Sequence, residues 1–341
     1  MNGAAKASLE WDSCRIPAVL AGAYEGVMKI YESSLVVLLV VSLFIPVAAA
    51  KEKLNAEALI ARHLQSLGSV ERLAAIKSRL IEGRSAMRVE VGGVGNALGR
   101  VVIASEGARY RVSLPFQYTD YWGEQLLFDG NGAQIGFSDI QKRSLLGDFL
   151  YRNDVILQEG LFGGVLSTAW PLSNSDKRHS RLEYVGQKKI YGRQLHQVSY
   201  HCRKGQGDMS IVLYFESETF RHVATVYSLF IQSEASTNLA VEASGEQGSR
   251  YKLEERFEGF KTFEGVTLPT RWNIIMETSG AKGQGHRDYR FGGTDSSSSG
   301  RTFQREWAII VDKVTENQSI DPKIWELVPE RDPRTSPQSP R

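Results

Sequence analysis

The sequence predicts a mainly β protein of the α+β class, built on one antiparallel sheet of about ten to eleven strands. From Arg79 onward, apolar and polar residues alternate in short runs separated by glycine-containing turns, the pattern of strands buried on one face. Two runs before Arg79 have apolar residues at helical spacing instead, and a continuously apolar stretch interrupts the strands in mid-chain. Because no helix separates the successive hairpins, we expect an antiparallel meander.

The chain begins with a predicted export signal. Leu35 to Ala50 is an uncharged apolar run, shorter than the roughly 20 residues that a membrane-spanning helix needs. Ala48 and Ala50 have the small-residue spacing of a signal peptidase site. We therefore expect a mature protein that starts near Lys51, without a transmembrane segment, in the periplasm or secreted. An uncleaved anchor is the alternative interpretation.

The residues before the apolar run indicate where the signal starts. Met28-Lys29 suits the basic flank of a signal, whereas residues 1–27 contain acidic residues that do not, so we interpret 1–27 as an extension of the gene model. The expected organisation is a signal region over 1–50, one domain over 51–328 and a disordered tail over 329–341.

Composition excludes several classes of protein. The 41 Lys+Arg balance 39 Asp+Glu, giving a net charge of +2 with no long run of one sign, which argues against a nucleic-acid partner. The two cysteines are Cys14, which precedes the cleavage point, and Cys202. The mature chain can therefore form no internal disulfide. We expect Cys202 to be buried and inert, because it shares the apolar phase of its strand.

Two short helices are expected to open the mature chain. Asn55 is a good N-cap for a helix that Gly68 ends, and Ser69 then caps a second, shorter helix. Strands follow, and the turns expected between them are Gly92-Gly93, Glu106-Gly107 and Asp129 to Gly132.

The mid-chain stretch is expected to be helical. Ser144 to Leu150 and Asp154 to Trp170 are too continuously apolar for a surface loop, and Asp154 can cap a helix that Trp170-Pro171 closes. Gly160, Gly163 and Gly164 each cost roughly 1 kcal/mol relative to Ala in a helix interior, so this helix should be stable only when packed. It is either an ordinary core helix or a movable cover over the sheet.

Strands return after residue 180 and continue to residue 314. The expected strands are Arg181 to Val185, His196 to Cys202, Ile211 to Phe215, His222 to Phe230, Tyr251 to Phe260, Val266 to Met276 and Thr302 to Val314. Two polar, Gly/Ser-rich spacers, 235–250 and 278–300, are expected to be mobile.

This organisation resembles the periplasmic lipoprotein-sorting carriers, the LolA/LolB-like superfamily, over roughly residues 54–328. The phrases that carry the resemblance are the helix pair AEALIARHLQSLGSVERLAAIKS, the strand IEGRSAMRVEV, the phrase VGQKKIYGRQLHQVSYHC, the strand start GVTLPTRW and the closing IDPKIWELVP. The resemblance implies a strongly curved antiparallel half-barrel with a helical cover and a cavity that holds acyl chains. It assigns no individual site residue.

An acyl-chain cavity would be lined by large apolar side chains. The candidates come from an aromatic-rich segment and from the cover: Phe116, Tyr118, Tyr121, Trp122, Phe149, Leu161, Phe162, Val165 and Trp170. Burying a chain there yields roughly 0.8 kcal/mol per methylene. Each of these residues could equally belong to an ordinary core.

The sequence contains no recognisable motif of an enzyme active site or a metal site. His196 and Cys202 lie about 20 Å apart on an extended strand, and His201 faces the other side, so these three cannot share a zinc ion. The other histidines, His63, His179, His222 and His286, lack neighbours of ligand type in sequence. The Gly92 to Gly99 segment misses the dinucleotide-binding spacing and is interpreted as a hairpin turn.

Paired carboxylates give no better indication of catalysis. Glu216 with Glu218, and Asp120 with Asp129, fall at strand ends or turns, where solvated carboxylates are common.

The sequence therefore predicts a non-enzymatic carrier or binding protein for a lipoprotein acyl chain or another lipid, without cofactor or metal. An envelope protein is a possible second partner. One alternative is an envelope scaffold whose half-barrel is filled, and another is a hydrolase with scattered site residues. A continuous apolar cavity would favour the carrier, a packed interior with an exposed apolar patch the scaffold, and a polar cleft the hydrolase.

Overall fold

The structure is a computed structural model that describes residues 54–90, 94–118, 121–139, 142–173, 181–231, 249–279 and 303–327. These residues belong to one compact unit, Leu54–Arg341. The predicted signal region, the tail from residue 329 and the greater part of both Gly/Ser-rich spacers lie outside the described residues. Within the described part, no helix is long and apolar enough to span a membrane.

Two capped helices open the domain, as predicted. Helix α2 (Ala56–Leu67) starts at Asn55, whose side chain accepts a hydrogen bond of 2.8 Å from the backbone N–H of Ala58. Gly68 ends α2, and Ser69 caps helix α3 (Val70–Ala74). The face of α2 that carries Leu59 and His63 is buried, so the helix packs onto the sheet.

The sheet has twelve antiparallel strands in the order β5-β4-β3-β2-β1-β14-β13-β10-β9-β8-β7-β6. The strands before the cover are β1 (Ser78–Glu90), β2 (Val94–Glu106), β3 (Arg109–Tyr118), β4 (Tyr121–Phe128) and β5 (Ala133–Ile135). Those after it are β6 (Arg181–Ile190), β7 (Arg193–His201), β8 (Ser210–Glu216), β9 (His222–Ile231), β10 (Ser249–Glu258), β13 (Arg271–Ser279) and β14 (Phe303–Glu316). A separate two-stranded ribbon consists of β11 (Lys261–Phe263) and β12 (Val266–Leu268).

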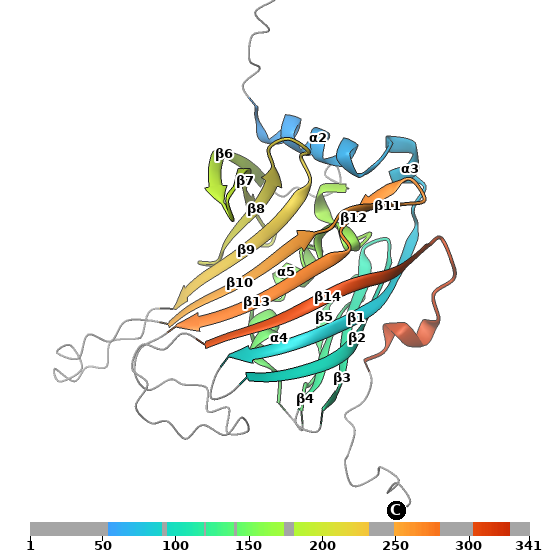
Figure 1. Cartoon of the computed structure of the whole chain (residues 1–341), viewed down its shortest axis with the longest axis vertical. Coiled ribbons are helices and arrows are strands. Elements are labelled where there is room, and N and C mark those ends of the chain that lie inside the picture. The colour runs from blue at the N-terminus through green and yellow to red at the C-terminus, as the bar shows by residue number, and fades with distance from the viewer. Residues whose placement is uncertain are drawn as a thin grey trace, which may run out of the picture. The chain divides into compact units, whose positions relative to one another are not determined.

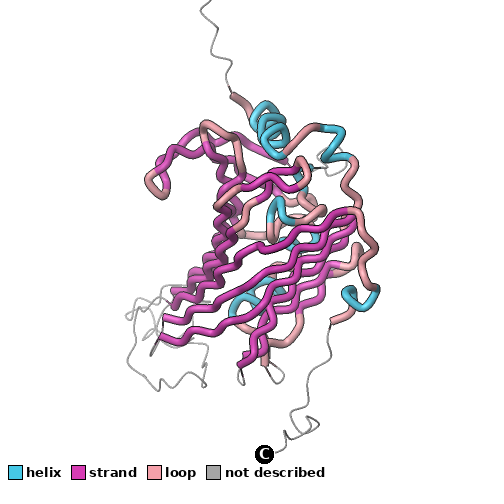
Figure 2. The backbone as a smooth tube through the Cα atoms, turned by 45° about the vertical axis from the view of Figure 1, so that its right-hand side comes forward, coloured by secondary structure: helices cyan, strands magenta, loops and turns pink. Residues whose placement is uncertain are grey.

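The first and last strands meet in the middle of the sheet. β1 pairs with β14, where Ala86 lies opposite Ala308, and this pairing joins the two halves of the meander. β5 and β6 are the two edges in this order, so the sheet is open. The sheet curves around the mid-chain helices α4 (Leu145–Arg152) and α5 (Val155–Gln158), as Figure 2 shows, and Figure 1 places both helices behind β13 and β14.

The single helix predicted over Asp154 to Trp170 is wrong. This segment contains α5, a 3₁₀ turn η1 (Gly164–Leu166) and irregular turns, because Gly160, Gly163 and Gly164 have φ values of 72°, 84° and 52°. These left-handed conformations suit glycine and cannot continue a right-handed helix. Asp154 makes no capping hydrogen bond, whereas Ser144 caps α4. Residues 144–173 are called the cover below.

Three strand predictions also need correction. The sheet has twelve strands instead of ten to eleven, and Val266 to Met276 is two strands, β12 and β13, rather than one. The segment Gly92 to Gly99 is not all turn, because β2 begins at Val94, where Val94 pairs with Glu90. Pro269 and Thr270 separate β12 from β13, and Gly95 and Gly99 lie within β2 itself.

The chain ends its described part on the outer face of the sheet. The 3₁₀ turn η3 (Pro322–Trp325) is held against β3 by Arg111, whose guanidinium donates to the carbonyl oxygens of Ile324 at 2.6 Å and Glu326 at 2.5 Å. Arg109 lies over the Trp325 ring.

Candidate ligand-binding site

The cover occupies the inner face of the curved sheet. Its buried side chains come from all of its short elements and belong to the main hydrophobic core: Leu146, Phe149, Leu150, Ile156, Leu157, Leu161, Phe162, Val165, Leu166 and Trp170. Ring contacts join the cover to three strands. Phe162 packs edge-on to Trp272 of β13 at 5.2 Å between centroids, and Trp170 lies 4.7 Å from His222 of β9. Phe149 stacks on Tyr251 of β10 at 6.4 Å.

The candidate lining residues from the sequence fall into two groups. Phe149, Leu161, Phe162, Val165 and Trp170 are all buried in the cover. The other group lies on β3 and β4.

In that second group, Phe116 and Tyr121 are buried and pack together at 5.3 Å between ring centroids. Trp122 is half-buried and follows Tyr121 on β4, so its side chain points to the opposite face. The side chain of Tyr118 lies outside the part of the structure that is described.

The side chains of the cover pack directly against the inner face of the sheet. A side chain that lines a void large enough for water exposes surface to that void, yet Leu161, Phe162 and Trp170 are 0% exposed. Trp272, which faces Phe162 from the sheet, is 0% exposed as well. In this conformation a ligand could reach the inner face of the sheet at these residues only if the cover moved.

Buried polar groups hold the cover in place at several points along its length. Glu159 accepts from the Tyr200 hydroxyl at 2.9 Å, and the backbone N–H of Gly163 donates to Glu255 at 2.7 Å. The Val165 carbonyl accepts from Arg79 at 2.7 Å, and the N–H of Thr168 donates to the Ser105 hydroxyl at 3.0 Å. Trp170 donates from its indole N–H to His63 at 3.3 Å. Three of these contacts use the cover's backbone, so they fix its path whatever its side chains are.

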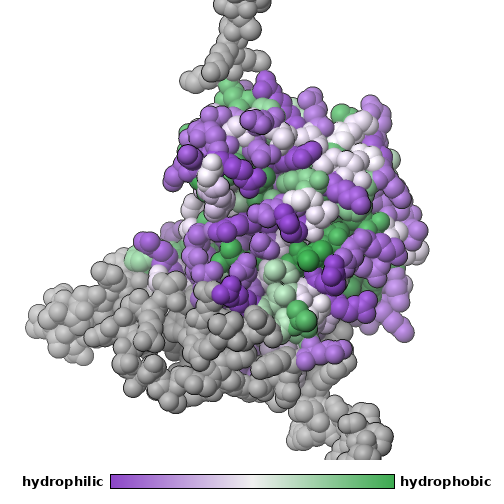
Figure 3. Space-filling model, viewed as in Figure 1, coloured by the Kyte–Doolittle hydropathy of each residue, from purple (hydrophilic) through white to green (hydrophobic). Residues whose placement is uncertain are grey.

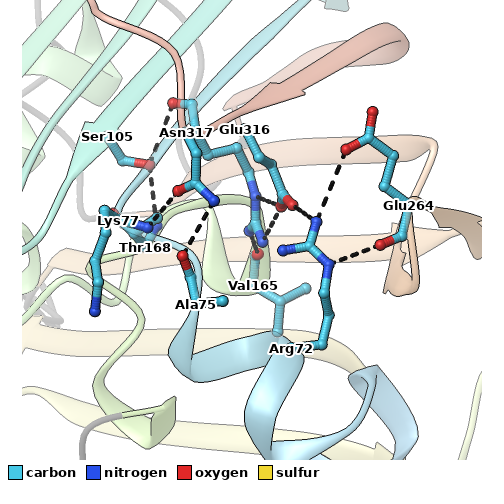
Figure 4. Close-up of polar contacts among 10 residues, drawn as sticks. Arg72, Ala75, Lys77, Ser105, Val165, Thr168, Glu264, Glu316 and Asn317 are labelled. Atoms are coloured by element: carbon cyan, nitrogen blue, oxygen red, sulfur yellow. Dashed lines mark hydrogen bonds and ion pairs between the residues drawn. The ribbon is translucent and has the colours of Figure 1, made fainter.

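Arg79 makes the most extensive of these contacts, and Figure 4 shows its partners Val165 and Glu316. Its guanidinium binds the Val165 carbonyl on one side and the carboxylate of Glu316, at 2.8 Å, on the other. Arg72 of α3 binds the same carboxylate and donates to the Glu264 carbonyl at 2.7 Å. Burial lowers the pKa of Arg79, and the neighbouring Glu316 carboxylate opposes that effect. The side chains of Arg79 and Glu316 are both 5% exposed. Without Glu316, Arg79 would be a buried charge with no ion-pair partner, whereas without Arg79, Glu316 would keep Arg72.

Asn317 completes this cluster from the end of β14. Its side chain accepts from the backbone N–H of Lys77 at 2.7 Å and donates to the Ala75 carbonyl at 3.1 Å. The cluster therefore connects α3, β1, β14 and the cover in one polar network (Figure 4).

Glu255 of β10 is, like Arg79, a buried charged residue beneath the cover. Its carboxyl group accepts from the Gly163 N–H at 2.7 Å, from the Tyr227 hydroxyl at 2.9 Å and from the Trp272 indole at 3.1 Å. Burial raises the pKa of Glu255 to about 8, and the three donors oppose that shift. The group is therefore largely protonated at neutral pH and changes charge just above it.

Two histidines lie together under the cover. His63 of α2 and His222 of β9 have ring centroids 6.3 Å apart, with Trp170 against both. Because Trp170 donates to Nε2 of His63, the proton of the neutral ring is on Nδ1, which donates to the Phe220 carbonyl at 3.1 Å. Burial lowers the pKa of His63 to about 4 and that of His222 well below its usual value. Both rings are neutral and structural at physiological pH.

Within the described residues no group of three or more His, Cys, Asp or Glu side chains could hold a metal ion. His196 is buried beside Tyr184 and Phe220, while His201 is part-exposed near Glu183. His179, His286 and Asp120 lie outside the described residues.

The sequence did not lead us to predict the buried roles of Arg79 and Glu255 or the pairing of His63 with His222. For the two charged residues a signal was present: Glu255 lies in the apolar phase of its strand between Leu253 and Phe257, and Arg79 occupies the same phase as Ile81. A charged residue at a position where the alternation expects an apolar one must find a buried partner. The histidine pair gave no such signal, because its members are far apart in the chain.

Comparisons with known proteins give similarities of structure. No family model matches the chain, and no curated protein matches it. Among solved structures, a LolA superfamily protein from Nitrosomonas europaea is 13% identical, with 80% of this chain and 98% of that chain covered and a TM-score of 0.38. A DUF1329 family protein from Desulfovibrio piger is 9% identical, with 79% and 96% covered and a TM-score of 0.37.

A third solved structure is a domain described as an outer membrane lipoprotein-sorting protein from Vibrio parahaemolyticus. It is 6% identical, with 78% of this chain and 94% of that chain covered and a TM-score of 0.38. The chain is similar to these three structures at low sequence identity. These similarities assign no ligand to it.

Proposed function

We propose that this protein is a non-enzymatic, extracytoplasmic carrier that holds the acyl chain of a lipid or lipoprotein between the inner face of its sheet and the cover. The observation that supports the proposal is the cover itself. It is a continuous apolar segment that lies inside the sheet, broken by left-handed glycines into short turns and held largely through its backbone. The candidate ligand contacts are Phe116, Tyr118, Tyr121, Phe149, Leu161, Phe162, Val165 and Trp170. Trp122 is not among them, because its side chain points to the opposite face of the sheet.

The energies involved allow an exchange between cover and ligand. An acyl chain of fourteen methylenes gains about 11 kcal/mol when it is buried, at roughly 0.8 kcal/mol per methylene. Removing five buried cover side chains of the size of Leu161 or Phe162 costs about 8 to 15 kcal/mol, at roughly 1.5 to 3 kcal/mol each. Because these two quantities are similar, a ligand can displace the cover reversibly, as a carrier requires.

A disulfide between the cover and the sheet tests this proposal. Ser105 of β2 and Thr168 of the cover are in contact through the hydrogen bond of 3.0 Å, so Ser105→Cys with Thr168→Cys should lock the cover. We expect the oxidised double variant to take up no fluorescent fatty acid and the reduced form to take it up. Each single cysteine variant is the matched control. Equal uptake in oxidised and reduced forms would show that the cover does not open.

The filled scaffold is the second candidate, and one observation favours it. The interior is packed, while the outer face of the sheet carries exposed apolar side chains, including Leu98 at 79% and Ile310 at 42% exposure. Figure 3 shows apolar residues gathered among polar ones on this side of the molecule. If neither form of the double-cysteine variant, nor the unmodified protein, takes up lipid, the scaffold is the better description.

A further inference from the structure

A surface patch of aromatic and basic side chains lies where the chain enters the cover. Arg143, just before α4, lies with its guanidinium 4.0 Å from the centre of the Tyr151 ring and 4.7 Å from that of Phe137. Tyr151 is 56% exposed and Phe137 is 38% exposed. Lys142 and Arg152, the sequence neighbours of Arg143 and Tyr151, are exposed too. These five residues are called the cationic aromatic patch.

The charge of the patch distinguishes it from a similar contact elsewhere. On the outer face of the sheet, Arg256 lies over the Tyr191 ring, but there Glu254 accepts hydrogen bonds from both side chains and neutralises the arginine. Among the described residues, none forms an ion pair with the side chains of Lys142, Arg143 or Arg152. The patch therefore presents three positive charges around two exposed rings.

Three acidic residues lie on the same helix and loops. Asp148 is half-buried and close enough to the buried carboxyl group of Glu124 to raise its pKa. Asp139 is buried. Asp154 accepts a hydrogen bond of 2.8 Å from Gln158.

We propose that the cationic aromatic patch is a contact surface for an anionic membrane. Aromatic rings with a polar or charged edge settle at the level of the lipid headgroups, and nearby Lys and Arg side chains are attracted to anionic lipids. Charge complementarity and the exposed rings favour this partner over an apolar protein groove, which would have to neutralise three cations. The contact does not require the cover to open, so it stands or falls separately from the carrier function.

Vesicle binding tests the membrane contact. The whole protein is sedimented with phosphatidylcholine vesicles and with phosphatidylcholine vesicles that contain phosphatidylglycerol. We expect stronger partitioning onto the anionic vesicles, reduced by added salt. Lys142→Gln with Arg152→Gln should reduce partitioning about fivefold for each cation removed. Phe137→Ser with Tyr151→Ser should reduce it about tenfold for each ring.

Matched variants keep the test specific. Lys188→Gln with Lys189→Gln removes two exposed cations from β6, and Ile310→Ser removes an exposed apolar side chain from the outer face of the sheet. Both controls should bind anionic vesicles as the unaltered protein does. The apolar run Leu35 to Ala50 is the same in every variant, so it cannot produce a difference between them. Circular dichroism confirms that each variant is folded.

Several results would overturn the membrane contact. These are equal partitioning onto the two kinds of vesicle, patch variants that bind like the unaltered protein, and control variants that lose as much binding as patch variants. If the patch variants lose an envelope protein partner while keeping full vesicle binding, the patch is a protein interface and the membrane proposal is wrong.

Discussion

Replacing Glu255 by glutamine should remove a specific part of the pH dependence of stability. The folded-state pKa of Glu255 is raised from 4.5 to about 8, so the folded protein holds a proton there that the unfolded chain releases. The corresponding stability is complete below the unfolded pKa and is lost as the pH rises through the folded pKa. The free energy of unfolding therefore falls with rising pH by up to about 1.4 kcal/mol per unit in this window.

The histidines act in the opposite direction over a different range. Burial lowers the folded-state pKa of His63 from 6.5 to about 4, and that of His222 is lowered as well. Their contribution is complete above the unfolded pKa and is lost as the pH falls toward 4. Between pH 6.5 and about 8 Glu255 should therefore lower the free energy of unfolding by roughly 2 kcal/mol, in addition to the contribution of Glu124, whose pKa burial also raises.

The assay is urea unfolding at several pH values from about 6 to about 8.5. We expect a maximum in stability near pH 6.5 for the unaltered protein and, for Glu255→Gln, a decline above it that is smaller by roughly 2 kcal/mol. The glutamine keeps an acceptor oxygen for the Gly163 N–H and the Trp272 indole, so the variant should stay folded. The reasoning fails if the variant shows the same decline, or if the unaltered protein shows none.

Three further predictions concern the other buried groups. Arg79→Leu should lower the free energy of unfolding, measured in urea, by about 3 to 5 kcal/mol, because it leaves Glu316 with one partner in a buried site. The control Arg84→Gln breaks an exposed pair with Asp312 between the same two strands and should cost less than about 1 kcal/mol. Similar losses in the two variants would contradict this prediction. Phe162→Ala should cost about 3 to 5 kcal/mol by the same measurement, since its ring is fully buried against Trp272, and a loss under 1 kcal/mol would mean that the cover is loosely packed. Cys202 should react with a thiol reagent only on unfolding, because burial raises its pKa to about 12 and its side chain is buried; fast labelling of the folded protein would refute that.

Much of the sheet could be predicted from the sequence because local patterns determine it. Alternation located the strands around Ile81, Val112, Val198 and Leu213, all of which are buried on the inner face. The caps at Asn55 and Ser69 were equally readable, since a capping hydrogen bond spans three residues. Local patterns do not show which strands pair with each other, because the contact of β1 with β14 joins residues more than two hundred positions apart.

The cover was predicted as an apolar element, and its second part, Asp154 to Trp170, was wrongly predicted as a single helix. Its apolar content correctly indicated burial, since Ile156, Leu161 and Leu166 are fully buried. Its conformation depends on glycines at positive φ, and a glycine by itself does not reveal whether it weakens a helix or ends one. The polar contacts that favour the end of the helix, such as that of Glu255 with the Gly163 N–H, come from strands nearly a hundred residues away.

The two kinds of contact that hold the cover have different consequences for how it could move. The apolar contacts are interchangeable, since any apolar chain of similar volume can replace Leu161 or Phe162 against the sheet. The polar contacts are not, because a buried donor or acceptor left without a partner costs about 1 to 3 kcal/mol, and a buried charge more. If the cover moves away, Arg79 and Glu255 lose the Val165 carbonyl and the Gly163 N–H. Those two groups must then meet water or the polar end of a ligand. A carrier of the kind proposed is therefore expected to take a ligand that combines an apolar chain with polar groups at one end, rather than a purely hydrocarbon one.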